Sequence, residues 1–334
     1  MMRENHISLA TYHEPRITPL FSLCIVTLLT FFYGRKIEYF TQKFCGKIMR
    51  KIVSSLIISI SIIIFNVSAF AGGWTPRKNG GYAKLWLRWQ AADGFLDGHH
   101  GAAHKFEAIG NYNELFLNAY LEYGLLDRLT AVAFWPFLTN YFMSDVNDFS
   151  YTGTGDPSLG LRLGLVQRKW VLSVQVLGTL PIANSDLRHP FFNTETGAFL
   201  GELRVGAGTW DVEPRVQTGI GWKSGHLGGE IGYRFRTDGF HTVFSGRAEA
   251  GYRIFRPLYG IVRIVRVRPV GSTTAPLDDS PTGIGNGTKY FGFSVELDWQ
   301  RGEHFSLGLV GEGATSYSRQ AGGPVFNVYG AWKW

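Results

Sequence analysis

Cysteine is nearly absent from this chain, and neither of its two copies lies beyond residue 71. Residues 72–334 therefore have no disulfide, no thiolate metal site and no cysteine nucleophile. The same part of the chain has no apolar run of 20 residues, which is the length that a membrane-spanning helix requires. Charged residues are also few, at 18% of the chain, whereas glycine (42 residues) and aromatic residues (15%) are abundant. This composition is unusual for a soluble enzyme and favours many strands and turns. Because a helical span is excluded in residues 72–334, any crossing of a membrane there must be made by strands.

An export signal is predicted at residues 49–71. It consists of a basic start at 49–51, an apolar core at 52–67 and an A-x-A cleavage site at 69–71. A signal of this kind is removed on export, so the mature protein is expected to be a single domain of residues 72–334. A permanent transmembrane anchor is the alternative.

Residues 1–48 precede this complete signal, and we interpret them as a non-native upstream extension, with translation starting at Met49. A cytoplasmic extension is the alternative. Of the 33 basic and 26 acidic residues of the chain, 8 and 3 lie in residues 1–71, so the net charge falls from +7 to +2 in the remainder. The basicity thus belongs mostly to the precursor, and a nucleic-acid partner is not expected.

Segments in which apolar and polar residues alternate recur from residue 80 onward. In the first of them, the odd-numbered residues are apolar and the even-numbered ones include Lys84, Arg88 and Gln90. We predict twelve strands, at residues 83–90, 114–123, 129–142, 158–165, 170–180, 210–222, 227–236, 244–254, 258–268, 291–299, 305–317 and 326–334.

The connections between these strands alternate in length. Those after odd-numbered strands are long or of medium length, at residues 91–111, 143–156, 182–206, 237–241, 269–287 and 318–323. Barrels of the bacterial outer membrane have short turns at one end, long loops at the other and an even number of strands, whereas a soluble β-sandwich has no reason to sort its loops in this way. We therefore predict an all-β fold, a single antiparallel up-and-down transmembrane β-barrel of about 12 strands.

Two strands depart from regular alternation. Pro136 interrupts the third predicted strand, and we expect a bulge or an edge distortion there. Arg266 and Arg268 lie on the opposite parity from Arg263, which predicts either a feature of the barrel rim or a bulge.

The last predicted strand resembles the final strand of bacterial outer-membrane β-barrels, which ends on an aromatic residue. The resemblance implies an assembly signal that the barrel assembly machinery recognises, formed by Phe326, Trp332 and Trp334. We expect this strand to pair with residues 84–90 and to turn its apolar face, which also includes Val328, toward lipid. Lys333, Tyr329 and Asn327 are then expected to face the lumen.

Alternate residues of each strand face lipid and the interior, and in a barrel of this kind the more polar set faces the interior. Both signs of charge occur in similar numbers in that set, which predicts a mesh of charge pairs, because buried charges must be paired or hydrated. This pattern fits a narrow polar conduit and also fits a packed interior that does not conduct. The predicted lumen-lining residues are Lys84, Arg88, Glu114, Asn118, Glu122, Arg162, Gln175, Glu213, Arg215, Gln217, Glu230, Arg234, Arg236, Arg247, Glu249, Arg253, Arg263, Glu296, Asp298, Glu312 and Asn327.

Catalytic and metal sites have weaker support. Asp278, Asp279 and His241 fall in predicted loops at one end, where a hydrolytic site is geometrically feasible but no spacing demands it. The cluster of His99, His100 and His104 has ligand chemistry for Zn²⁺ or Cu²⁺ but no carboxylate at a defined spacing. We therefore expect no enzyme activity, no cofactor and no metal site, with most histidines in connections.

The stretch 153–163, with the sequence GTGDPSLGLRL, resembles the G-x-G-D strand-opening motif of a group of outer-membrane barrels. These are the meta-pathway phenol-degradation proteins and related transporters, which are distantly similar to FadL-type fatty-acid transporters. Pro136 and the pair Leu180-Pro181 fit the same pattern. The resemblance implies uptake of small, often hydrophobic or aromatic, compounds across the outer membrane. One departure is that only residues 72–79 precede the first strand, so the N-terminal hatch of FadL-type barrels is not expected.

The resulting hypothesis is a monomeric outer-membrane channel that passes a small solute passively through a narrow, charge-lined lumen. Its expected partners are outer-membrane lipid, lipopolysaccharide, the assembly machinery and the solute. The alternatives are a non-conducting barrel with a role in surface interaction or matrix export, and an outer-membrane hydrolase.

Overall fold

The structure is a computed structural model that describes residues 73–96, 106–144, 147–278, 280–283 and 285–334. The predicted extension at 1–48 and the predicted signal peptide at 49–71 lie outside the described residues. No helix in the described part of the chain is long and apolar enough to cross a membrane.

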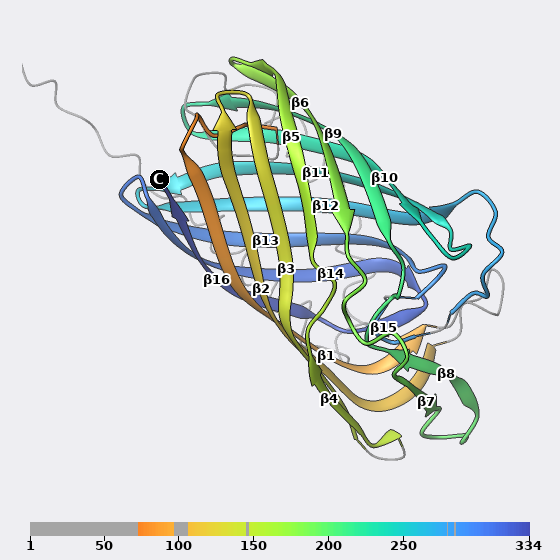
Figure 1. The fold of residues 1–334 in the computed structure, drawn as a ribbon. Coiled ribbons are helices and arrows are strands. Elements are labelled where there is room, and N and C mark those ends of the chain that lie inside the picture. Colours follow the sequence, from red (N-terminus) through yellow and green to blue (C-terminus); the bar gives the residue numbers. More distant parts are fainter. Residues whose placement is uncertain (1–72, 97–105, 145–146, 279, 284) are drawn as a thin grey trace, which may run out of the picture. The chain divides into compact units, whose positions relative to one another are not determined.

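Twelve antiparallel strands close into a ring, as the sequence predicts (Figure 1). The ring closes where β1 pairs with β2 on one side and with β16 on the other, with Lys84 opposite Ala331 and Gln90 opposite Val325. The predicted pairing of the last strand with the first is therefore confirmed. In ring order the strands are β1 (Gly81–Leu96), β2 (Phe106–Leu126), β3 (Leu129–Met143), β5 (Ser158–Gln167), β6 (Trp170–Thr179), β9 (Asp211–Trp222), β10 (Gly225–Arg236), β11 (Thr242–Phe255), β12 (Leu258–Val270), β13 (Lys289–Arg301), β14 (Phe305–Ser318) and β16 (Val325–Lys333).

Alternation along each strand gives the barrel an apolar outer face. On β5, Leu161 and Leu163 are exposed whereas Arg162 between them is buried. On β16, Phe326 and Val328 are exposed whereas Asn327 is buried. Apolar surface left in water costs about 25 cal/mol per Å², so a continuous belt of such side chains is stable only against lipid.

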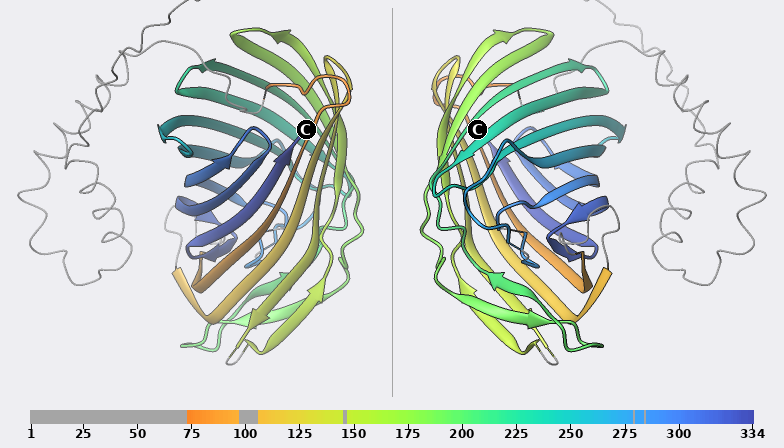
Figure 2. Two further views of the ribbon diagram at one scale, coloured as in Figure 1. Left: turned by 90° about the vertical axis from the view of Figure 1, so that its left-hand side faces the viewer. Right: turned by 90° about the vertical axis from the view of Figure 1, so that its right-hand side faces the viewer.

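The two ends of the barrel differ. The short turns β2–β3, β5–β6, β9–β10, β11–β12 and β13–β14 lie at one end, which we call the turn end, and the longer connections lie at the other, the loop end (Figure 2). The chain enters β1 and leaves β16 at the turn end, where the backbone amide of Gly81 donates to the Trp334 carbonyl (3.0 Å) and that of Trp334 donates to the Gly81 carbonyl (3.1 Å).

Four connections that were predicted as loops contain strands, so the prediction is wrong in these segments. β1 and β2 extend well into residues 91–111, and the other three connections hold β4 (Phe149–Gly153), the hairpin β7 (Arg188–Phe192) and β8 (Phe199–Arg204), and β15 (Gln320–Gly322).

The reason is an apolar cluster at the loop end that the strand extensions and the hairpin bury together. Phe95, Ile109 and Tyr141 from β1–β3 pack with Phe191 and Leu203 from β7 and β8, and none of them is more than 1% exposed. Because these residues are distant in sequence, their shared burial has no local signature.

The two predicted irregularities have different outcomes. Pro136 does accompany a bulge, since Leu117 pairs with Leu138 and Asn118 pairs with Pro136, which leaves Phe137 unpaired. β12 instead pairs with β11 in unbroken register from Tyr259 to Val270, so the bulge alternative for Arg266 and Arg268 is wrong. Both arginines are exposed on the outer face near the loop end, consistent with the rim alternative.

Candidate functional site: the barrel interior

The interior has two unlike walls. In the ring of twelve strands, β9–β12 lie across from β16 and β1–β3. The wall formed by β9–β12 carries Arg215, Arg234, Arg247 and Arg263, one on each of its four strands. We call this wall, with its four arginines, the arginine wall. The arginines share the inner face because each occupies the parity opposite to the exposed apolar residues of its strand.

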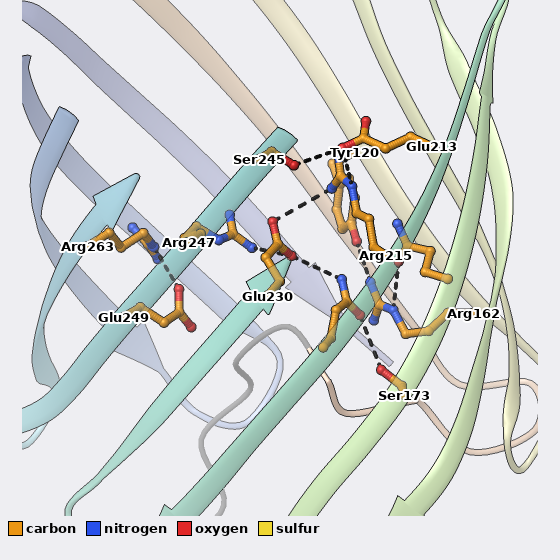
Figure 3. A network of polar contacts seen from close by, with 12 residues as sticks. Tyr120, Arg162, Ser173, Glu213, Arg215, Glu230, Ser245, Arg247, Glu249 and Arg263 are labelled. Carbon is orange, nitrogen blue, oxygen red and sulfur yellow. Dashed lines mark hydrogen bonds and ion pairs between the residues drawn. The ribbon is translucent and has the colours of Figure 1, made fainter. Parts of the chain in front are cut away.

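Each guanidinium of the arginine wall pairs with a carboxylate on its own or a neighbouring strand. Figure 3 shows these pairs for Arg215, Arg247 and Arg263. Glu213 accepts from Arg215 Nε (2.9 Å) and from Arg234 Nε (3.1 Å). Arg247 Nη2 donates to Glu230 Oε2 at 3.2 Å. Together they form a connected network of the kind that the sequence predicts for a charged interior.

Arg263 extends the network to two further carboxylates. Its Nε donates to Glu249 Oε2 (2.8 Å), and its Nη1 donates to Glu296 on β13. On the same stretch of wall, His226 Nε2 lies 3.3 Å from Glu249 Oε1. His226 is buried within β10 and His189 lies within β7, so the expectation that histidines fall in connections does not hold for these two.

A second cluster surrounds Arg162 on β5. Its Nη2 lies 2.9 Å from Glu122 Oε1 and 3.0 Å from the Tyr120 hydroxyl, and its Nε donates to Gln175 Oε1 at 2.9 Å. Its Nη1 donates to the backbone carbonyl of Trp74 at 3.2 Å. Arg162 is 3% exposed, so these hydrogen bonds and the ion pair satisfy the donors of a buried guanidinium.

The segment that precedes β1 lies against the inner face at the turn end. The Gly73 carbonyl accepts from Gln167 Nε2 (3.0 Å), and the Thr75 amide donates to Gln167 Oε1 (3.3 Å). The ring of Trp74 lies over Gly219 on β9, where a β-carbon would approach it to 2.6 Å. No hatch was expected from so short a segment, yet it occupies interior space at the turn end.

The opposite wall adds aromatic rings to its charged residues. Trp86 and Phe134 stack with ring centroids 5.8 Å apart, and Lys84 Nζ lies 3.6 Å from the centre of the Tyr329 ring. The Tyr329 hydroxyl donates to Glu296 Oε1 at 2.6 Å. Trp86 and Phe134 are interior residues that were not predicted, because only polar residues were assigned to the interior. Their positions in the alternating pattern of their strands place them on the inner face.

The structure places all the predicted lumen-lining residues on the inner face and brings most of them together in pairs. Beyond the clusters above, Arg88 pairs with Glu114, Asn327 Nδ2 donates to Glu312 Oε1 (2.5 Å), and Arg236 Nε lies 3.6 Å from Asp211 Oδ1. The other predicted residues contact uncharged groups or further members of the network. Gln217 donates to Glu230 (3.1 Å) and accepts from Ser173 (3.2 Å), and Arg253 donates to the Tyr259 hydroxyl (2.6 Å). Asp298 accepts from Gln300 (2.7 Å), and Asn118 is buried beside β3.

The loop-end candidates for other chemistry have structural roles where the structure describes them. Asp278 Oδ2 lies 3.2 Å from Arg204 Nη1 and accepts from the Asn286 amide, and the His241 amide donates to Asn286 Oδ1 (3.0 Å). Asp279 lies outside the described residues, as do the three histidines of the predicted loop cluster at 99–104. Among the residues that are described, no group of three His, Cys, Asp or Glu side chains is arranged to hold a metal ion.

A closed ring of twelve antiparallel strands, apolar outside and polar inside, is the fold of the outer-membrane β-barrels. The structure is similar to that of an outer membrane channel from Pseudomonas putida F1, with a TM-score of 0.55 and 14% identity over 80% of this chain and all of that one. It is also similar to the NanC porin, with a TM-score of 0.43 and 9% identity over 75% of this chain and all of that one. For the CymD monoaromatic hydrocarbon channel the TM-score is 0.37 and the identity 8%, over 77% of this chain and 88% of that one. No protein-family model matches the chain, and no curated protein matches it.

Proposed function

We propose that this protein is an outer-membrane channel that passes small solutes passively through a narrow, charge-lined lumen. The observation that carries the proposal is the exposure of inner-face guanidiniums. The side chains of Arg234 and Arg247 are 43% and 37% exposed although they point to the inside of a closed ring. A barrel filled by its own side chains would bury them, so the space between the two walls is accessible to water.

The solute is limited in size and character by the two walls. Twelve strands enclose less space than the 16 or more strands of the general porins, and Trp74 reduces that space further at the turn end. The stacked rings of Trp86 and Phe134 offer apolar surface along the path. They support the proposal, drawn from the resemblance to the meta-pathway phenol-degradation group, that small hydrophobic or aromatic compounds are carried.

Placement in the outer membrane follows from the same proposal. Residues 49–71 direct export and are removed, residues 72–334 form the barrel, and residues 1–48 are not part of the native chain. The exposed apolar belt contacts lipid, and Arg266 and Arg268 lie on the outer face near the loop end, where they meet the phosphates of lipopolysaccharide. The barrel is a monomer without enzyme activity, and the assembly machinery recognises Phe326, Trp332 and Trp334.

Planar-bilayer recording tests the channel. The protein is expressed as the full chain, purified from outer membranes and reconstituted, and discrete conductance steps are expected. Trp74→Ala should enlarge these steps because it removes a ring from the interior. Trp299→Ala, which removes the same ring from the outer face of β13, should leave them unchanged. Silence at all voltages, together with no solute entry into liposomes, would favour the non-conducting barrel with a surface or export role.

A further inference from the structure

We infer that the lumen selects for anions, so that the small, hydrophobic or aromatic solutes of the proposed channel also have a carboxylate or another negative group; this inference rests on the proposed channel function. The number of charges does not produce this preference, because basic and acidic residues on the inner face are similar in number. The preference comes from how far each kind of charge extends into the lumen. The guanidiniums extend toward the water, and the carboxylates lie behind them against the wall.

In the pairs of the arginine wall, the guanidinium is always more exposed than the carboxylate that it contacts. Arg234 is 43% exposed and its partner Glu213 is 5% exposed; Arg247 is 37% exposed and its partner Glu230 is 14% exposed. Arg215 and Arg263 are likewise more exposed than every carboxylate that they contact. Each pair is thus a dipole whose positive end meets the aqueous path.

Arg88, which lies on β1 in the opposite wall, follows the same order with Glu114. The exception is Arg162, which is more deeply buried than Glu122, and Arg236 and Asp211 are buried to a similar degree. Both guanidiniums are buried, so neither pair sets the charge that the aqueous path meets.

Neutral donors hold the carboxylates back against the wall. The Ser245 hydroxyl donates to Glu213 Oε1 (3.2 Å), Gln217 Nε2 donates to Glu230 Oε2 (3.1 Å), and the Tyr329 hydroxyl donates to Glu296 Oε1 (2.6 Å). Such contacts leave fewer acceptor positions of the carboxylates available to a passing cation.

Guanidiniums in this position favour anions for two reasons. They stay charged at every physiological pH, and their planar set of donors matches a carboxylate in two parallel hydrogen bonds. A cleft lined by one sign of charge and bounded by low-dielectric walls also raises the local concentration of the opposite ion. The wall across the lumen presents the rings of Trp86 and Phe134 rather than exposed carboxylates, so it does not cancel this effect.

The reversal potential across a KCl gradient measures the preference directly. A potential that favours Cl⁻ over K⁺ is expected from the wild-type protein, purified from outer membranes. At about 7 Å in a water-like medium, one charge changes the local ion concentration by about two- to threefold. The double variant Arg234→Gln/Arg247→Gln should therefore lower the Cl⁻/K⁺ permeability ratio by about fourfold or more.

Two controls match this variant. Arg266→Gln/Arg268→Gln removes the same two charges from the outer face of β12 and should leave the ratio unchanged, and Arg247→Lys keeps the charge and should preserve most of it. Heat-modifiable migration on gels verifies that each variant is folded. If the Arg234/Arg247 variant does not fold, the wild-type reversal potential decides by itself.

Three outcomes would overturn the inference. A wild-type ratio at or below one removes the anion preference while leaving a channel in place. An equal shift from the outward-facing pair assigns the effect to the surface instead of the lumen. Absence of any conductance contradicts the channel proposal itself, which separates that failure from a failure of the anion preference.

Discussion

Replacement of Arg162 by methionine tests whether the buried cluster stabilises the barrel. The variant fills similar space but removes the ion-pair partner of Glu122, which then keeps only the Tyr120 hydroxyl, and it removes the donors to Gln175 and to the Trp74 carbonyl. Loss of one partner from a buried ion pair costs about 3–5 kcal/mol, because the remaining charge is left without compensation. Glu122 is itself largely buried, so water compensates little of this loss.

The expected effect on unfolding follows from that value. For a chain of this size the urea dependence of the free energy of unfolding is about 3 kcal/mol per M, so Arg162→Met should lower the urea midpoint by about 1–1.7 M. Tryptophan fluorescence of the barrel in lipid vesicles measures the transition. Arg162→Met/Glu122→Leu should recover part of the loss, because no unpaired charge remains.

Arg247→Met is the matched control. Its pair with Glu230 has nearly the same separation, 3.2 Å, but the guanidinium reaches water, so the loss should stay within about 1 kcal/mol. An equal decrease of the midpoint in both variants, or an unchanged midpoint in Arg162→Met, would contradict a stabilising role of the buried cluster.

Two further perturbations address assembly and the loop end. Deletion of Trp334 removes the proposed assembly signal and two backbone hydrogen bonds that close the ring with Gly81, so the outer-membrane fraction should contain severalfold less heat-modifiable barrel; normal levels would contradict this role. Phe191→Ala leaves a cavity in the apolar cluster that should cost about 3–5 kcal/mol and loosen the β7–β8 hairpin. Limited proteolysis should cut the hairpin faster in that variant but not in Phe199→Ala, whose side chain is 61% exposed; equal rates would count against the cluster as its anchor.

Much of the barrel was predictable from the sequence because the deciding pattern is local. A strand places successive side chains on opposite faces, so the order Leu161, Arg162, Leu163 already assigns one face to lipid and the other to the interior. The recurrence of such segments then predicts twelve strands, and the alternation of short and long connections predicts a barrel with both termini at one end. For the same reason every predicted interior residue lies on the inner face.

The tertiary structure decided what depends on contacts between distant segments. The apolar cluster joins Phe95, Tyr141 and Phe191, and no local pattern in residues 182–206 predicts the hairpin that completes it. Trp74 enters the interior only because the ring brings Gln167 and Arg162 next to the segment before β1. The depth of each charge is likewise decided by the neighbours that close over it. Parity alone places Arg234 and Glu213 on the same face, and only the packed barrel shows that the guanidinium reaches the water while the carboxylate stays against the wall.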